Sequence, residues 1–162
     1  MGATGGGSGG CVLIMVEIPD YIPPYRAYTI NLNGMIVKKS MRAKLAWIIR
    51  VLVRKMGADI VLIQETHFKT PKDMKEAFFP YSGQLRGYSP SGTRSKGVVA
   101  YIPPDSALYG MVHNVETNLE GRWALMEIRA QTESQQLLNV YAPSVTTPKL
   151  EKLGNEDLVQ GP

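Results

Sequence analysis

The sequence predicts an α/β fold in which helices flank a mixed, largely antiparallel sheet. Three observations favour this class. Residues 60–63 are a short run of β-branched and aliphatic side chains, the pattern of a strand that is buried on both faces. Residues 41–56 carry apolar side chains at three- and four-residue spacing, as an amphipathic helix does. Short apolar segments separated by Gly, Pro and Ser follow them, and such segments are typical of antiparallel strands.

Composition indicates one globular domain from a reducing compartment. A chain of 162 residues with 44% hydrophobic and 20% charged residues is long and apolar enough to form one domain with a core. Because Cys11 is the only cysteine, an internal disulfide framework is excluded. One cysteine and two distant histidines, His67 and His113, cannot form a zinc site of the usual kind. The net charge of +4 is compatible with a nucleic-acid partner but does not require one.

The two ends of the chain differ in composition from its centre. Glycine fills six of the first ten positions and three prolines lie between positions 19 and 24, so we expect residues 1–25 to be a disordered or irregular leader. The domain then covers residues 26–146, and residues 147–162 form an irregular tail. The apolar run at residues 11–16 is too short to span a bilayer, and no basic residue precedes it. We therefore expect an intracellular, nuclear protein without a membrane partner.

Two helices have recognisable ends. Ser40 is the predicted N-cap of the helix over residues 41–56, and Gly57 is its stop signal. The Arg and Lys residues of this helix lie off the apolar stripe, so we interpret them as a solvated face rather than a DNA-binding face. A second, shorter helix begins after a capping Thr70 and ends before Pro80.

The second half of the chain predicts a loop followed by strands. Residues 81–96 are rich in Ser, Gly, Tyr and Arg and are expected to be a mobile basic loop. Residues 97–102, 122–129 and 136–141 have the apolar content and the boundaries of strands. We expect these strands to form an antiparallel meander.

Polar residues stand where three predicted strands end. Asn31 and Asn33 end the strand before the first helix, Glu65 follows the buried strand, and Tyr141 ends the last one. A strand-helix-strand crossover brings the first two ends to the same edge of the sheet, where ligands collect in open α/β sheets. Carboxylate and amide oxygens suit Mg²⁺, which takes one or two carboxylates from a protein. Each residue also has an ordinary interpretation: a solvated Glu, turn asparagines and a strand aromatic.

Five segments in this order resemble the endonuclease/exonuclease/phosphatase superfamily. Within it they are most similar to the endonuclease domain of non-LTR (LINE-type) retrotransposons, which is similar to AP endonuclease and exonuclease III. The resemblance covers about residues 28–145 and implies the N-terminal portion of a four-layer α/β sandwich. The segments are Asn31-Leu-Asn-Gly34, Ile63-Gln-Glu-Thr-His67, Lys96-Gly-Val-Val-Ala-Tyr101, Glu120-Gly-Arg-Trp123 and Asn139-Val-Tyr-Ala-Pro143.

The resemblance implies roles for the residues at the strand ends. Glu65 matches the metal-binding glutamate and Asn33 a position near that metal, so that Mg²⁺ (or Mn²⁺) is the expected cofactor. Asn31 matches an asparagine that supports the catalytic centre, and Tyr141 a tyrosine that approaches the scissile phosphate. The implied reaction is metal-assisted hydrolysis of a DNA phosphodiester, with a reverse transcriptase domain as a possible neighbour in a full-length element. Phosphate contacts are expected from Ser144, Arg94, Lys96 and Arg122.

The sequence also departs from the pattern of the superfamily. Ser144 stands where an Asn is common, and the catalytic Asp and Asn of a Gly-Asp-Phe-Asn segment and a terminal Asp-His pair are missing from these 162 residues. We therefore expect an incomplete, inactive domain that exposes an apolar sheet face and an open edge, because the missing part builds most of the second sheet. Two alternatives stay open: a non-catalytic nucleic-acid-binding remnant, and a phosphatase or deadenylase of the same superfamily.

Overall fold

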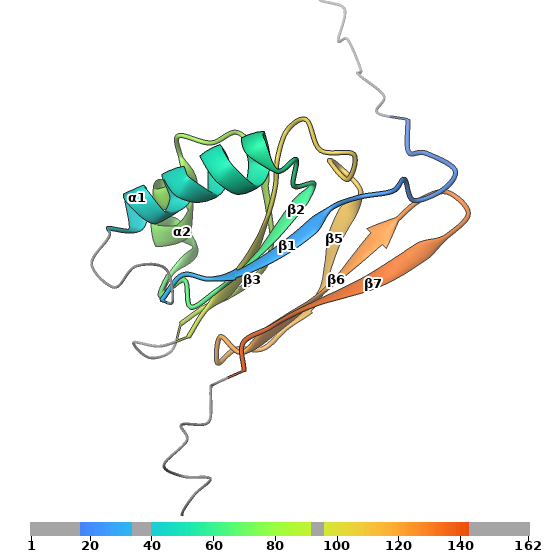
Figure 1. Ribbon diagram of the computed structural model, residues 1–162. Helices are drawn as coiled ribbons and strands as arrows, with labels where there is room; N and C mark the ends of the chain where they lie inside the picture. Colours follow the sequence, from blue (N-terminus) through green and yellow to red (C-terminus); the bar gives the residue numbers. More distant parts are fainter. Residues whose placement is uncertain (1–16, 34–39, 92–95, 143–162) are drawn as a thin grey trace, which may run out of the picture.

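The computed structural model describes residues 17–33, 40–91 and 96–142, which form three layers. Two helical segments cover one face of a four-stranded sheet, and a three-stranded sheet packs against its other face (Figure 1). The predicted α/β class is confirmed, and the described residues supply three of the four layers of the expected sandwich. The elements in chain order are β1 (Ala27–Asn31), α1 (Met41–Trp47), η1 (Ile48–Lys55), β2 (Ile60–Gln64), α2 (Pro71–Phe78), β3 (Gln84–Ser89), β4 (Val98–Ile102), β5 (Val112–Thr117), β6 (Trp123–Arg129) and β7 (Ser134–Val140).

The first sheet has the strand order β1-β2-β4-β3 and is mixed. Strands β1 and β2 are parallel, with Asn31 opposite Gln64, whereas β4 is antiparallel to both β2 and β3. The predicted crossover is thus present, and the carboxyl ends of β1 and β2 lie at one edge. The crossover could be predicted from the sequence because a helix is the usual connection between neighbouring parallel strands.

Strand β2 is buried on both faces because a different layer covers each of them. Val61 and Ile63 pack in the cluster that includes the helical residues Leu45 and Ile48. Ile60, on the opposite face, packs with residues of the second sheet such as Met126. Because successive side chains of β2 point to opposite faces, they pack in two separate hydrophobic clusters. This explains the continuous apolar run in the sequence.

Both predicted helices form. The Ser40 side chain accepts a hydrogen bond from the Ala43 amide (3.4 Å), and that of Thr70 accepts one from the Asp73 amide (3.2 Å). The first helix continues as the π-helix η1 and ends before Gly57, whose φ of 68° is the left-handed value expected after a helix. The exposed positions of this helix include its arginines Arg42, Arg50 and Arg54, in agreement with a solvated face.

Two predictions for the second half of the chain were wrong. Gln84–Ser89 is strand β3, not part of a mobile loop, because its backbone pairs with the buried strand β4. The ladder is irregular between Arg86 and Ser89, and the intervening Gly87 has a φ of 58°, so the alternation that marks a strand is broken. Strand β4 belongs to the first sheet, and the meander is completed instead by β5, a polar strand that the sequence analysis missed.

The second sheet is the antiparallel meander β5-β6-β7. Residues 112–140 build three strands of this sheet. The expectation that residues outside the chain build most of it stays a prediction. Its outer face carries exposed apolar side chains, among them Leu138 (52% exposed) and Val140 (47%). Residues 17–25 adopt no regular element and hydrogen-bond to the β6–β7 connection, as Pro19 and Asp20 do through their carbonyl groups. Within the described ranges, no helix is long and apolar enough to cross a membrane.

Candidate functional site

The carboxyl ends of β1 and β2 position the first group of candidate residues. The amide of Leu32 donates to the carbonyl oxygen of Gln64 (3.0 Å), so the two chains stay paired up to the residue before Glu65. Asn31 is exposed, and its Oδ1 accepts the amide of Asn33 (2.9 Å). This contact is a short side-chain turn of the kind that Asn commonly forms. The structure thus gives Asn31 a turn-forming role at the edge, while the metal-binding role of Asn33 stays a prediction.

Glu65 lies in an unusual environment for a carboxylate. It is only 8% exposed, and its Oε2 has no hydrogen-bond partner among the described residues. Its φ of 51° is in the left-handed region, as is that of His67 (57°), and these are the only non-glycine residues of the described ranges with positive φ. Such a backbone costs about 1–3 kcal/mol per residue and is concentrated at ligand sites. A buried, strained and incompletely paired carboxylate indicates a functional position.

Tyr141 joins Glu65 from the other sheet. Its amide donates to the carbonyl of Arg122 (2.7 Å), which holds the residue beside the start of β6. Burial raises the pKa of the Tyr141 phenol, and a hydrogen bond with the Glu65 carboxylate and the charge of that group raise the pKa further. The Arg122 guanidinium lowers it. The Tyr141 phenol is therefore near enough to Glu65 for that carboxylate to raise its pKa.

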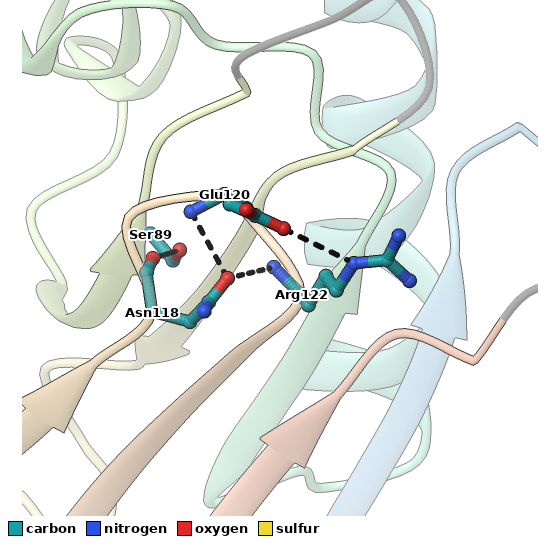
Figure 2. A network of polar contacts seen from close by, with 4 residues as sticks. All are labelled: Ser89, Asn118, Glu120 and Arg122. Carbon is teal, nitrogen blue, oxygen red and sulfur yellow. Dashed lines mark hydrogen bonds and ion pairs between the residues drawn. The ribbon is translucent and has the colours of Figure 1, made fainter.

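A polar network fixes the turn that carries Arg122 (Figure 2). The side-chain oxygen of Asn118 accepts the amides of Glu120 (3.0 Å) and Arg122 (3.3 Å), and the Ser89 hydroxyl donates to the Asn118 carbonyl. The Arg122 guanidinium makes an exposed ion pair with Glu120 (3.6 Å). Exposed pairs of this kind contribute little, so Arg122 can exchange Glu120 for an anionic ligand at low cost.

Two further loops converge on the same edge. The amides of Thr66 and His67 donate to the carbonyls of Gly97 (3.1 Å) and Lys96 (3.2 Å). The amide of Gly97 in turn donates to the carbonyl of Gly121 (3.0 Å). These bonds pair the backbone of Lys96 with the segment after Glu65 and join Gly121, the residue before Arg122, to Gly97. The phosphate contacts of Lys96 and Arg122 stay predictions. The other two predicted contacts, Arg94 and Ser144, lie outside the described residues.

Gln64 and Asn139 form a buried pair of amide side chains beside the candidate site. The Gln64 side chain donates to Asn139 Oδ1 (2.7 Å) and to the hydroxyl of Thr29 (2.8 Å). Asn139 is fully buried, and its Nδ2 donates to the carbonyls of Ile63 and Val99 (3.3 Å each). Sequence reasoning missed this pair, although each amide stands next to, or two residues from, a predicted site residue.

The described residues of this edge offer few ligands for a divalent cation. No cluster of three or more His, Cys, Asp or Glu occurs in the described part of the chain, which argues against a metal cage made only of protein. Mg²⁺, however, keeps several waters and is often bound by one or two carboxylates. The unpartnered Oε2 of Glu65 is a donor of this kind. The donor set is therefore compatible with a water-rich Mg²⁺ or Mn²⁺ and not with a closed structural site.

Comparison with known proteins identifies the fold. No protein-family model and no curated protein matches the sequence. Among solved structures, the chain is similar to the AP endonuclease LMAP from Leishmania major, with a TM-score of 0.53 and 14% sequence identity. The match covers 77% of this chain and 42% of that protein. At this identity the likeness shows a shared fold, and the chain spans less than half the length of the AP endonuclease.

Proposed function

We propose that this chain is the metal-binding and phosphate-facing portion of a Mg²⁺-dependent DNA endonuclease domain of the endonuclease/exonuclease/phosphatase superfamily, of the AP-endonuclease-like type found in retrotransposons. The observation that supports the proposal most is the state of Glu65, which is buried, has a left-handed φ of 51° and keeps Oε2 without a partner among the described residues, while its charge raises the pKa of Tyr141. These residues come from different sheets, and both were selected as strand-end residues from the sequence. The AP-endonuclease-like fold supports the same assignment.

In this proposal the residues near the carboxyl ends of β1 and β2 have separate roles in the hydrolysis of a phosphodiester. Glu65 would hold the cation, with Asn33 as a neighbouring ligand. A bound Mg²⁺ supplies Lewis-acid stabilisation of charge on phosphate oxygens. The Tyr141 phenol has a single O–H, which it would turn from Glu65 toward a phosphate oxygen of bound DNA. Lys96 and Arg122 contact flanking phosphates and set affinity and register.

We propose further that the 162 residues bind DNA without cleaving it efficiently. The sequence contains no Gly-Asp-Phe-Asn segment, and no histidine follows His113. A general base that activates water is therefore missing from the set of residues proposed here. Cation binding and phosphate contacts require none of these segments.

Duplex binding and plasmid nicking together test the proposal. Fluorescence anisotropy with a labelled duplex, with and without Mg²⁺, is compared for the wild type, Glu65→Gln and Glu76→Gln. The last variant removes the same charge from the exposed face of α2. We expect Mg²⁺ to tighten binding in the wild type and Glu76→Gln but not in Glu65→Gln, with nicking of supercoiled plasmid near background in all three. Binding that is indifferent to Mg²⁺ in every variant contradicts the metal role of Glu65.

A second candidate is a nucleic-acid-binding remnant without a metal site. The lack of a carboxylate and histidine cluster in the described ranges favours it, as does the surplus of basic residues. In this case affinity falls steeply with salt, because binding consists of phosphate contacts. Salt-sensitive binding that does not change with Mg²⁺ or in Glu65→Gln selects the remnant. Robust nicking that Glu65→Gln abolishes instead shows that the chain is catalytically complete.

A further inference from the structure

His67 is an exposed residue in an otherwise buried segment. Its neighbours Glu65, Thr66 and Phe68 are buried, whereas His67 lies at the surface. Among the described residues, its imidazole has no hydrogen-bond or ion-pair partner. The described part of the fold therefore gains no polar contact from this side chain.

Backbone hydrogen bonds hold His67 beside the loop that precedes β4. The Thr66 amide donates to the Gly97 carbonyl (3.1 Å), and the His67 amide donates to the Lys96 carbonyl (3.2 Å). A Cβ on Gly97 would lie 2.5 Å from the Thr66 hydroxyl oxygen, so the two segments are in close contact. The backbones of His67 and Lys96 are therefore direct neighbours.

The residue after His67 is held just as firmly. The Phe68 carbonyl accepts the Ser91 amide (2.9 Å) and the Tyr88 hydroxyl (3.0 Å), and the Phe68 ring packs edge to face on Phe78. Because both neighbours of His67 are buried and hydrogen-bonded, its own backbone has little freedom to change. The fold thus sets the direction in which the His67 side chain leaves the loop.

The backbone of His67 is left-handed, with a φ of 57°. Glycine adopts this conformation without strain, whereas an L-residue adopts it at a cost. His67 therefore combines a strained backbone with a side chain that has no polar partner among the described residues. Observed strain of this kind is concentrated at sites that bind ligands. A ligand for the imidazole accounts for both features.

The surroundings of His67 favour an anionic ligand. The Lys96 carbonyl accepts its amide, and Lys69, which is exposed, follows two positions later. The carboxylate that precedes His67 in the sequence, Glu65, is buried. An imidazole has an N–H donor whether it is neutral or protonated, so it suits a phosphate oxygen in either state.

We propose that His67 is a further substrate contact, whose imidazole donates a hydrogen bond to a DNA phosphate at the carboxyl ends of β1 and β2. This inference rests on the proposed function, because DNA is the substrate proposed there. Lys96 and Arg122 have long, flexible side chains, whereas the short side chain of His67 projects from a fixed backbone. It therefore sets the position of one phosphate relative to Glu65.

Duplex binding by three variants tests this contact. His67→Gly removes the side chain and relieves the backbone, His67→Asn keeps an N–H donor on a shorter side chain, and His113→Ala removes the other histidine of the chain. Fluorescence anisotropy with a labelled duplex and Mg²⁺ gives the affinities. Urea denaturation and Mn²⁺ titration without DNA are run on the same proteins.

We expect His67→Gly to weaken duplex binding about tenfold, because one hydrogen bond to a charged group is lost. His67→Asn should lie between this variant and the wild type, and His113→Ala should bind like the wild type. The Mn²⁺ affinity and the unfolding free energy of His67→Gly should not fall, because the imidazole contacts neither the cation nor the core.

Several outcomes overturn the contact. His67→Gly that binds the duplex like the wild type does so and leaves the proposed function intact, whereas a wild type that binds no duplex contradicts both. A loss of duplex affinity that comes with an equal loss of Mn²⁺ affinity or with a lower unfolding free energy also overturns it, because the change then acts through the loop. If His67→Gly does not fold, His67→Asn decides: binding weakened about threefold supports the contact, and wild-type affinity contradicts it.

Discussion

Glu65 and Tyr141 follow strands of different sheets, and the Glu65 carboxylate acts on the Tyr141 phenol, whose pKa it raises. One oxygen of the carboxylate has no partner among the described residues, and burial, followed by the Glu65 carboxylate, raises the pKa of the Tyr141 phenol. The left-handed backbone at Glu65 shows that the fold holds this residue against its local preference.

The pKa of Tyr141 gives a direct test of this pair. Burial is the largest cause of its rise, so in Glu65→Gln we expect the pKa to fall but to stay above its ordinary value. Titration of tyrosines labelled with carbon-13 at Cζ measures it, and Tyr141→Phe identifies the resonance. A raised folded-state pKa means that the stabilising effect is complete below the unfolded pKa of about 10 and is lost as the pH rises through the folded value. An unchanged Tyr141 pKa in Glu65→Gln contradicts the contact.

At the scale of elements, the site depends on how closely the loops approach one another. A Cβ on Gly121 would lie 2.5 Å from the Pro90 carbonyl oxygen and 2.7 Å from the Gly97 nitrogen, so the turn before β6 contacts the loop before β4 through bare backbone. This approach holds Lys96 and Arg122 at the same edge.

A comparison of Gly121→Ala with Gly110→Ala tests the close contact between these two loops. Both glycines have a left-handed backbone, with φ of 74° and 79°, but a Cβ on Gly110 would have no atom within 4 Å. We expect Gly110→Ala to lose about 1 kcal/mol of unfolding free energy from backbone strain. Gly121→Ala should lose about 2 kcal/mol more, because backbone atoms must move. Urea denaturation measures both, and equal losses show that the loops are not in close contact.

The elements differ in how well the sequence predicted them. The first helix and β2 can be recognised from their own residues. The helix has a stripe of apolar residues, and β2 has a continuous apolar run. Strand β3 is a strand because β4 lies beside it, and its Gly87 breaks the alternation by which a strand is recognised. Strand β5 is largely polar and three of its six residues are exposed, so its sequence is similar to that of a loop. Both segments are strands because a neighbouring strand pairs with their backbone and not because of an alternating apolar pattern, which explains both omissions.

The same distinction applies to the site. Asn31, Glu65 and Tyr141 could be selected because each is a polar residue at the end of an apolar segment. The Gln64 and Asn139 pair could not, because 75 residues separate its members and each amide alone has the character of an ordinary strand residue. Arg94 and Ser144 lie outside the described residues, so their phosphate contacts stay predictions.

At the scale of the whole molecule, the buried amide pair connects the two sheets. Asn139 of β7 contacts β2 and β4, and Gln64 extends the connection to β1. Replacing one member leaves polar groups of the other buried with fewer partners, a situation that costs about 1–3 kcal/mol.

A double-mutant cycle measures the coupling within the pair. We expect Asn139→Leu and Gln64→Leu each to lower the unfolding free energy by about 2 kcal/mol. The double variant should lose about 1 kcal/mol less than the sum of the two, because each single change already removes the shared hydrogen bond. Strictly additive losses in chemical denaturation show that the two amides act independently.

Binding of Mn²⁺ to Glu65 tests the central claim most directly. The paramagnetic resonance signal of free Mn²⁺ is followed while wild type, Glu65→Gln or Glu76→Gln is titrated into it. We predict one site of equal affinity in the wild type and Glu76→Gln, with affinity about tenfold or more weaker in Glu65→Gln because a carboxylate ligand is lost. The same affinity in all three proteins, or no binding by the wild type, contradicts a cation site at the end of β2.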